Sequence, residues 1–237
     1  MVLMSMSATQ ALAWEEQALR EVLIDQTPRF LIWEPIEKVM VLPASGKWRT
    51  TPQLTDHMEK LGWKIEQRKT GGSPVPQAPG VINLSMVYPW PDKLELSTSN
   101  SYQLLIAILE LWLSNYGVKA ETGEITGAYC NGVYNLSIND RKFIGTAQRI
   151  SRTSSVNNKK QVGVLAHAFI LINPNIDSLV DAVNECYQQS GHSEVFTREA
   201  MTSLTEHNDE INMNNSKLAA DLYLSIQSMI DKYLTKI

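Results

Sequence analysis

Gln67 to Val75 reads QRKTGGSPV and Gly132 to Arg149 reads GVYNLSINDRKFIGTAQR, and these are the two most informative stretches of the chain. The first puts an arginine, a hydroxyl and two glycines at a turn, where bare backbone can approach an anion or a carbonyl group. The second predicts a β-hairpin, because strand-like runs flank the turn-forming pair Asn139 and Asp140. Lys142 follows that turn, so the hairpin would hold one amine at a fixed point.

The composition describes a chain that can bury a large core and carries little net charge. At 237 residues one large domain is as plausible as two, and a net charge of −4 gives no basic field for nucleic acid. The longest apolar run, residues 104–109, is too short to span a bilayer, and no secretory pattern opens the chain. We therefore expect no membrane partner. Two cysteines without an export signal favour a reduced, cytoplasmic setting over a disulfide.

Hydrophobic periodicity and breaker residues predict mixed helices and strands. Helices are predicted over residues 8–24, 51–61, 99–116, 176–187, 197–206 and 214–234, and strands over 30–33, 39–42, 63–66, 82–86, 136–138, 143–149 and 164–172. The polar run 151–161 predicts a mobile loop. We expect a single catalytic domain over residues 1–237, with a helical C-terminal part from about residue 176.

Together, in this order, the two stretches resemble the lipoate-protein ligase and octanoyltransferase family, which shares the biotin/lipoate protein ligase catalytic domain. The family pattern is roughly Arg-Arg-x-Thr/Ser-Gly-Gly-Gly early and Gly-Arg-Lys-x-x-Gly-x-Ala-Gln later. Residues 80–85 (GVINLS) are similar to the strand after the glycine turn, residues 11–16 to the opening helix, and residues 162–172 to a strand that carries a histidine. The resemblance covers most of residues 11–175. It implies an α/β fold of the α+β type, with a mixed, mainly antiparallel sheet flanked by helices.

The resemblance also implies the site residues. An exposed lysine after a turn is ordinarily a solvated charge, but the family lysine at the position of Lys142 holds the acyl carbonyl or an acyl-adenylate phosphate as a fixed positive charge. His167 in an apolar strand is ordinarily a core histidine, and in the family it lines or supports the pocket. The substrate-binding residues implied are Arg68, Thr70, Gly71, Gly72, Asn83, Gly145 and His167. The sequence contains no metal-binding pattern, so no metal is expected.

Cys130 decides between reactions. A lone cysteine is most often a small buried hydrophobe, and Cys186 on a predicted helix fits that interpretation. The segment around Cys130, AYCNGVYNLS over residues 128–137, resembles the one that carries the nucleophile in the cysteine-dependent octanoyl- and lipoyl-transferring members. There a thiolate takes an acyl group as a thioester and then passes it to the amine of a carrier lysine.

The expected function is an acyltransferase that moves an octanoyl or lipoyl group to a lysine of a lipoyl carrier domain or a glycine-cleavage H-like protein. The donor would be an acyl carrier protein or an acylated carrier, and no cofactor would be needed. An alternative is an ATP-dependent lipoate-protein ligase acting through lipoyl-adenylate, which would need ATP and Mg.

A non-catalytic acyl- or lipoate-binding homologue is a further alternative, motivated by three departures from the family pattern. Ser73 replaces the third glycine, Pro74 cannot donate a backbone N–H, and Gln77 stands where the family often has histidine. The first two departures put phosphate binding by the glycine turn in doubt. The sequence names neither the acyl donor nor the oligomeric state.

Overall fold

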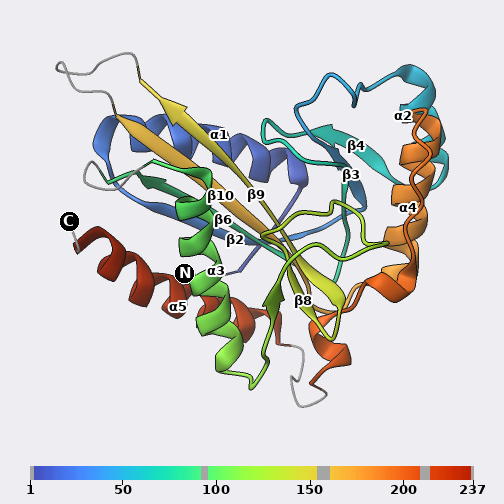
Figure 1. The fold of residues 1–237 in the computed structure, drawn as a ribbon. Coiled ribbons are helices and arrows are strands. Elements are labelled where there is room, and N and C mark those ends of the chain that lie inside the picture. The colour runs from blue at the N-terminus through green and yellow to red at the C-terminus, as the bar shows by residue number, and fades with distance from the viewer. Residues whose placement is uncertain (1–2, 92–95, 154–160, 209–213, 236–237) are drawn as a thin grey trace.

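The computed structural model describes residues 3–91, 96–153, 161–208 and 214–235. Its centre is a seven-stranded sheet in the order β1-β2-β6-β10-β9-β8-β7 (Figure 1). The strands are β1 (Met4–Met6), β2 (Arg29–Pro35), β6 (Val81–Pro89), β7 (Glu121–Thr122), β8 (Leu136–Ile138), β9 (Arg141–Arg152) and β10 (Val162–Leu171). β1 pairs with β2 in parallel and the other neighbours pair antiparallel. The predicted mixed, mainly antiparallel sheet is confirmed.

A second, three-stranded sheet lies beside the first in the order β4-β3-β5. Its strands are β3 (Val39–Leu42), β4 (Lys64–Gln67) and β5 (Val75–Gln77). The sequence did not predict β5, which contains Pro76, but an edge strand tolerates a residue without a backbone N–H. The strands β1 and β7 were also missed, because runs of two or three residues give no measurable period.

In the described part of the chain, five α-helices cover the two sheets (Figure 1). They are α1 (Ala8–Asp25), α2 (Pro52–Lys60), α3 (Thr98–Ser114), α4 (Ile176–Gln189) and α5 (Asn215–Thr235). α3 and α5 pack together on one face of the large sheet, and α1 lies on the other face. α2 and α4 lie against the small sheet. The helices α1 to α4 each begin at a capping residue whose side chain accepts a backbone N–H. These residues are Ser7, Thr51, Ser97 and Asn175, in chain order.

The pleat of the central strands separates an apolar core from a mixed face. Alternate residues of β6 and β10, among them Leu84, Met86, Ala166 and Ala168, join the core under α3 and α5. The residues between them face α1 and the small sheet. This second face includes Asn83, Ser85, His167 and Phe169, which the strand register places side by side.

Two predicted elements were wrong in part. Residues 197–206 form two short 3₁₀ turns, Arg198–Ala200 and Leu204–Glu206, instead of one helix. Between them Met201 bridges Lys142, and the N–H of Thr202 donates to the carbonyl of Lys142 at 2.9 Å, so this backbone pairs with β9. The predicted loop at 151–161 starts too early, because Ser151 and Arg152 belong to β9; residues 154–160 lie outside the described residues.

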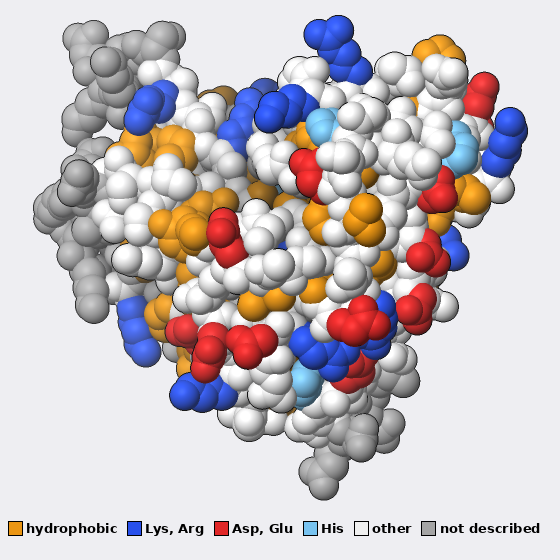
Figure 2. Space-filling view, turned by 45° about the vertical axis from the view of Figure 1, so that its right-hand side comes forward, with side chains coloured by type: hydrophobic (Ala, Val, Ile, Leu, Met, Phe, Trp, Pro, Cys, Tyr) orange, Lys and Arg blue, Asp and Glu red, His pale blue; other side chains and the backbone are white. Residues whose placement is uncertain are grey.

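The other predicted helices and strands are confirmed, with ends that differ by at most three residues. Among the described helices, none has the length and apolar character needed to cross a membrane. Figure 2 shows acidic and basic side chains mixed along the lower edge of the molecule, in agreement with the small net charge.

Candidate active site

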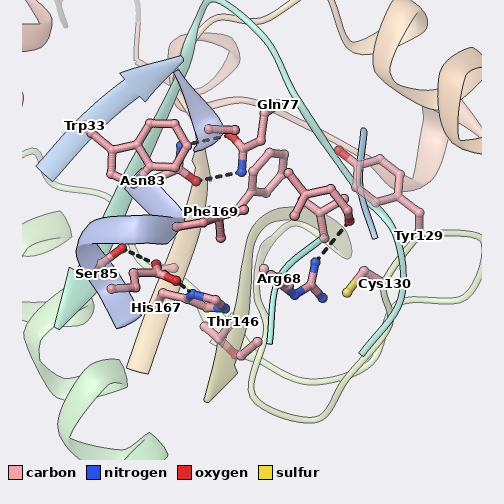
Figure 3. A pocket seen from close by; sticks show the side chains of 18 of the residues that line it. Trp33, Arg68, Gln77, Asn83, Ser85, Tyr129, Cys130, Thr146, His167 and Phe169 are labelled. Carbon is pink, nitrogen blue, oxygen red and sulfur yellow. Dashed lines mark hydrogen bonds and ion pairs between the residues drawn. The ribbon is translucent and has the colours of Figure 1, made fainter. Parts of the chain in front are cut away.

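A cavity lies between α1, the mixed face of the large sheet and the small sheet (Figure 3). Its empty volume is about 620 Å³, a figure that includes the open mouth and the solvent space in it. Six of the nine predicted site residues line this central cavity: Arg68, Asn83, Cys130, Lys142, Gly145 and His167. Gly71 and Gly72 line a neighbouring groove, and Thr70 is buried behind His167.

Strand register gives the central cavity its long axis. Trp33, Asn83, Phe169 and Gly145 are consecutive partners across β2, β6, β10 and β9. Neighbouring strands lie about 4.8 Å apart, so this row extends over roughly 14 Å. Figure 3 shows Trp33 and Asn83 on one side of the view and Cys130 on the other. The cavity therefore runs across the strands, in a shape suited to an extended chain.

Lys142 places its amine at one end of this row. The side chain is only 1% exposed, and Nζ donates to the carbonyl oxygens of Tyr129 at 2.6 Å and Cys130 at 2.7 Å. A Cβ on Gly145 would lie 3.4 Å from Nζ, so the missing side chain leaves the amine room against the strand. Burial lowers the pKa of Lys142 to about 8, and the nearby Cys130 opposes the shift. The amine is fixed and buried, so a solvated surface lysine is excluded.

Cys130 adopts a strained backbone conformation. Its φ is +49°, a left-handed value that costs a non-glycine residue on the order of 1–3 kcal/mol. Its carbonyl accepts from both Lys142 Nζ and Asn135 Nδ2, the latter at 2.9 Å. Asn135 Oδ1 in turn accepts the N–H of Thr146 at 2.9 Å, which ties the cysteine segment to β9. Sequence reasoning missed Asn135, since a single asparagine before a strand gives no signal of a bridging role.

Arg68 fills the inside of the glycine turn. The residue is 5% exposed, and its guanidinium donates to the carbonyl oxygens of Gly71 and Ser73, both at 2.9 Å. Gly72 has a φ of +106°, and a Cβ there would lie 3.1 Å from Arg68 Nη2 and 3.7 Å from Cys130 Sγ. The guanidinium and the thiol thus both lie beside Gly72. Burial lowers the pKa of Arg68, and the neighbouring Cys130 opposes this effect.

A chain of polar side chains crosses the mixed face beside Arg68. Glu15 Oε1 accepts from Ser85 Oγ at 2.6 Å and lies 3.2 Å from His167 Nδ1 (Figure 3). His167 Nε2 lies 3.3 Å from Thr70 Oγ1. Glu15 is 5% exposed and was missed from the sequence. The signal was present, since Glu15 stands four residues from both Ala11 and Leu19 on the buried stripe of α1.

A second polar pair lines the far part of the central cavity. The amides of Gln77 and Asn83 exchange two hydrogen bonds of 2.9 Å each. Gln77 belongs to β5, directly after the glycine turn, so Asn83 ties the turn to the large sheet.

Unpaired polar atoms gather around the central cavity. Among the described residues, six buried side-chain nitrogen or oxygen atoms have no hydrogen-bond partner. Three of them, Trp33 Nε1, Arg68 Nε and the Tyr129 hydroxyl, belong to residues that line this cavity. Each unpaired buried atom lowers the stability of the fold by about 1–3 kcal/mol. Half of these atoms belong to residues that lie where a ligand would bind. No group of three or more His, Cys, Asp or Glu side chains in the described ranges could hold a metal ion.

A groove meets the central cavity at Cys130. It shares Cys130, Thr146 and Ala147 with that cavity. Its other lining residues are Gly71, Gly72, Thr98, Tyr102, Asn131, Gly132, Asn135, Gln148 and Ile150. The ring of Tyr102 stacks on Tyr134 with centroids 4.2 Å apart. The thiol-bearing residue is therefore accessible from two directions.

Relatives of known name are similar to parts of this chain. An octanoyl-[GcvH]:protein N-octanoyltransferase of Kyrpidia tusciae is 32% identical over 144 residues, which is 60% of this chain and 49% of that protein. The protein of the same name from Anoxybacillus flavithermus is 27% identical over 232 residues, 94% of this chain and 80% of that protein. A lipoyl-[GcvH]:protein N-lipoyltransferase of Listeria monocytogenes is 27% identical over 134 residues, 57% of this chain and 47% of that protein. The match to the first and third spans about half of each relative.

Solved structures share the fold. A lipoate-protein ligase A bound with ATP superposes with a TM-score of 0.73 at 18% identity, over 97% of this chain and 84% of that one. A bipartite lipoate protein ligase of Thermoplasma acidophilum gives 0.70 at 18% identity, over 97% of this chain and 82% of that one. The family model for the lipoyl protein ligase A/B catalytic domain matches residues 7–221. The chain belongs to the lipoyl protein ligase A/B catalytic domain family.

Proposed function

We propose that this chain transfers an octanoyl or lipoyl group to a lysine of a lipoyl carrier protein through a thioester on Cys130. One observation carries the proposal: Cys130 lies where the central cavity meets the groove, with the Lys142 amine bound to its carbonyl. The names of the octanoyl- and lipoyl-transferring relatives support the same choice of acyl group.

The central cavity and the groove each hold a different part of the substrate. The central cavity is long, lies on the sheet and is mostly apolar, so it takes the acyl chain. The groove is lined mainly by neutral polar and small side chains, among them Thr98, Gln148 and Asn131, and it takes the arm that carries the acyl group. The acyl carbonyl then sits at their junction, within reach of the Cys130 thiol.

The transfer proceeds in two displacements at the acyl carbonyl. The Cys130 thiol loses its proton, and its sulfur attacks the carbonyl carbon of the donor. A thioester forms while the donor's leaving atom takes up a proton. The ε-amine of the acceptor lysine then attacks the thioester. An amide forms, the thiolate leaves, and the proton lost by the amine restores the thiol.

Lys142 serves both displacements. Its pKa of about 8 makes the neutral amine and the ammonium both accessible near neutral pH. The neutral amine can accept the thiol proton, and the resulting ammonium faces the negative charge that develops on the carbonyl oxygen. Because the amine is already held by two carbonyl groups, little reorganisation is needed during the reaction.

The ATP-dependent ligase is the weaker candidate. Family ligases would bring phosphate to the glycine turn, but here the turn presents two carbonyl groups to Arg68 and carries Pro74. A proline lacks the N–H that an anion would use. These features favour a neutral acyl substrate at the turn over an adenylate.

Intact-mass spectrometry tests the proposal. The chain is mixed with an octanoylated carrier protein in the absence of ATP, and its mass is measured before and after hydroxylamine. We expect a gain of one octanoyl group that hydroxylamine removes, followed by loss of the group to an apo lipoyl domain. An unchanged mass together with unmodified acceptor would contradict transfer and leave the ligase or a binding protein.

A further inference from the structure

Glu15 is a buried acidic residue that the transfer chemistry does not use. It comes from α1, whereas the thiol, the amine and the glycine turn come from other elements. Its carboxylate faces the central cavity and contacts Ser85 and His167, not Cys130 or Lys142. Burying a carboxyl group costs free energy unless specific partners compensate it. The partners of Glu15 therefore indicate its role.

The contacts of Glu15 favour one tautomer of His167. A carboxylate oxygen only accepts hydrogen bonds, so the 3.2 Å contact to Nδ1 is a hydrogen bond only when that nitrogen carries the proton. In the neutral ring Nε2 is then an acceptor, and the Thr70 hydroxyl can donate to it over 3.3 Å. Ser85 Oγ donates to the same carboxylate oxygen and helps to fix its orientation.

Thr70 connects this chain to the reaction centre. It directly precedes Gly71 and Gly72, and its carbonyl accepts the N–H of Ala44 at 3.0 Å. Gly72 faces the thiol, since a Cβ built on it would lie 3.7 Å from Cys130 Sγ. Arg68 holds the same turn from its inner side through Gly71 and Ser73. The turn is therefore clamped by Arg68 on one side and by Thr70 on the other.

We propose that Glu15 is a positioning residue: it keeps His167 protonated at Nδ1, so that Nε2 holds Thr70 and thereby fixes the glycine turn against the thiol of Cys130. This role rests on the proposed acyl transfer at Cys130 and adds to it a residue that does not touch the reacting atoms. It acts through the hydrogen bonds of two intermediates, in the way that a buried carboxylate orients a catalytic histidine.

The tautomer of His167 is a direct readout. ¹⁵N NMR of the ¹⁵N-histidine-labelled chain, with His167 assigned from the signal lost in His167→Gln, distinguishes Nδ1–H from Nε2–H. We expect a neutral ring with Nδ1–H in the wild type. In Glu15→Gln the side chain can donate to Nδ1 as well as accept from it, so the ring is no longer held in one tautomer and an Nε2–H population should appear. A wild-type ring protonated at Nε2, alone or with Nδ1, would overturn the assignment, as would an unchanged tautomer in Glu15→Gln.

Kinetics test whether the tautomer matters to the thiol. Glu15→Gln should lower the rate constant for acylation of Cys130 by roughly 10²-fold, the scale for a misplaced reacting group, with little change in the KM for the octanoylated carrier. The matched control is Glu16→Gln, the next residue on α1, which pairs at the surface with Lys69 and Arg149. The control should acylate at the wild-type rate. Equal losses in both variants would refute the role of Glu15.

Thr70 gives a second, independent test if Glu15→Gln folds poorly. Thr70→Val keeps the shape and removes the hydroxyl, and Thr70→Ser restores it. We expect Thr70→Val to slow acylation and Thr70→Ser to recover most of the rate. In a double-mutant cycle Glu15→Gln should cost little more once Thr70 is valine. Additive losses would show that the two residues act separately and would overturn the proposed chain.

The two proposals fail in different ways. If the wild type forms no acyl-enzyme with any donor, transfer through Cys130 is wrong whatever the tautomer. If the acyl-enzyme forms but the rate of its formation does not respond to Glu15→Gln and Thr70→Val, transfer stands and the positioning role of Glu15 is wrong.

Discussion

The Nζ atom of Lys142 donates to the carbonyl oxygen of Cys130 across 2.7 Å. Lys142 thus holds the backbone of Cys130, the residue proposed as the nucleophile. Because Cys130 is in a left-handed conformation, this hydrogen bond also helps to keep its side chain at the junction of cavity and groove. Lys142 therefore contributes to position as well as to charge.

Lys142→Ala should slow acyl transfer by roughly 10² or more, the usual effect of losing one preorganised charge-stabilising donor. The measurement is single-turnover acylation of the chain by an octanoylated carrier. Lys64→Ala is a suitable control, because that lysine is largely exposed and pairs with Glu37 away from the cavity. Unchanged kinetics in the Lys142 variant would show that the lysine hairpin is not part of the site.

Cys130→Ser should abolish acyl transfer while leaving the fold nearly intact, because an unactivated hydroxyl is a much weaker nucleophile than a thiolate. Loss of the hydroxylamine-sensitive mass gain and a preserved circular dichroism spectrum are the expected results. Cys186→Ala should keep the mass gain, since Cys186 is buried in the core beside α2. Turnover by Cys130→Ser at the wild-type rate would remove the thioester mechanism.

The buried amine should make stability depend on pH. Burial lowers the pKa of Lys142 from its ordinary value of 10.5 to about 8. Between these values the unfolded chain binds a proton that the folded chain does not, so the free energy of unfolding rises with pH in this window. Lys142→Met removes the group without a large change of shape. The wild type should gain about 2 kcal/mol relative to this variant between pH 7 and pH 9.5.

Urea unfolding of both proteins at the two pH values measures this difference, in which titrating groups that do not interact with Lys142 cancel. A difference that stays constant would mean that the amine keeps its ordinary pKa in the folded chain. A difference that moves the other way would mean that burial favours the ammonium, in conflict with the geometry.

Sequence periodicity predicted the long elements of the fold and missed the short ones. α3 and β10 bury one continuous stripe or face, so their pattern survives without knowledge of their neighbours. The helix predicted over residues 197–206, around Met201, was wrong because a distant contact decides the structure there. The backbone of this segment pairs with Lys142 on β9, and this distant contact overrides a local pattern that resembles a helix.

Some residues of the candidate site could likewise be identified from local sequence, whereas others could not. Arg68, Cys130 and Lys142 stand in local motifs, so a family resemblance could identify them. Glu15 does not, because its partner His167 is 152 positions away in the sequence and the pair exists only after α1 has packed on the sheet. Local sequence can show that a carboxylate lies on an apolar stripe, but only the fold can show which histidine it meets.

The final prediction separates transfer from ligation. The chain should fail to lipoylate an apo lipoyl domain when it is given free lipoate and Mg-ATP as the only acyl source. The physical reason is the glycine turn, whose carbonyl groups at Gly71 and Ser73 face Arg68 and whose Pro74 has no N–H to offer a phosphate. The readouts are the mass of the lipoyl domain and the release of AMP. A parallel reaction with an octanoylated carrier in place of lipoate and ATP shows that the preparation is active. Robust lipoylation with release of AMP would overturn the transferase and establish the ligase, since a transferase has no use for the nucleotide.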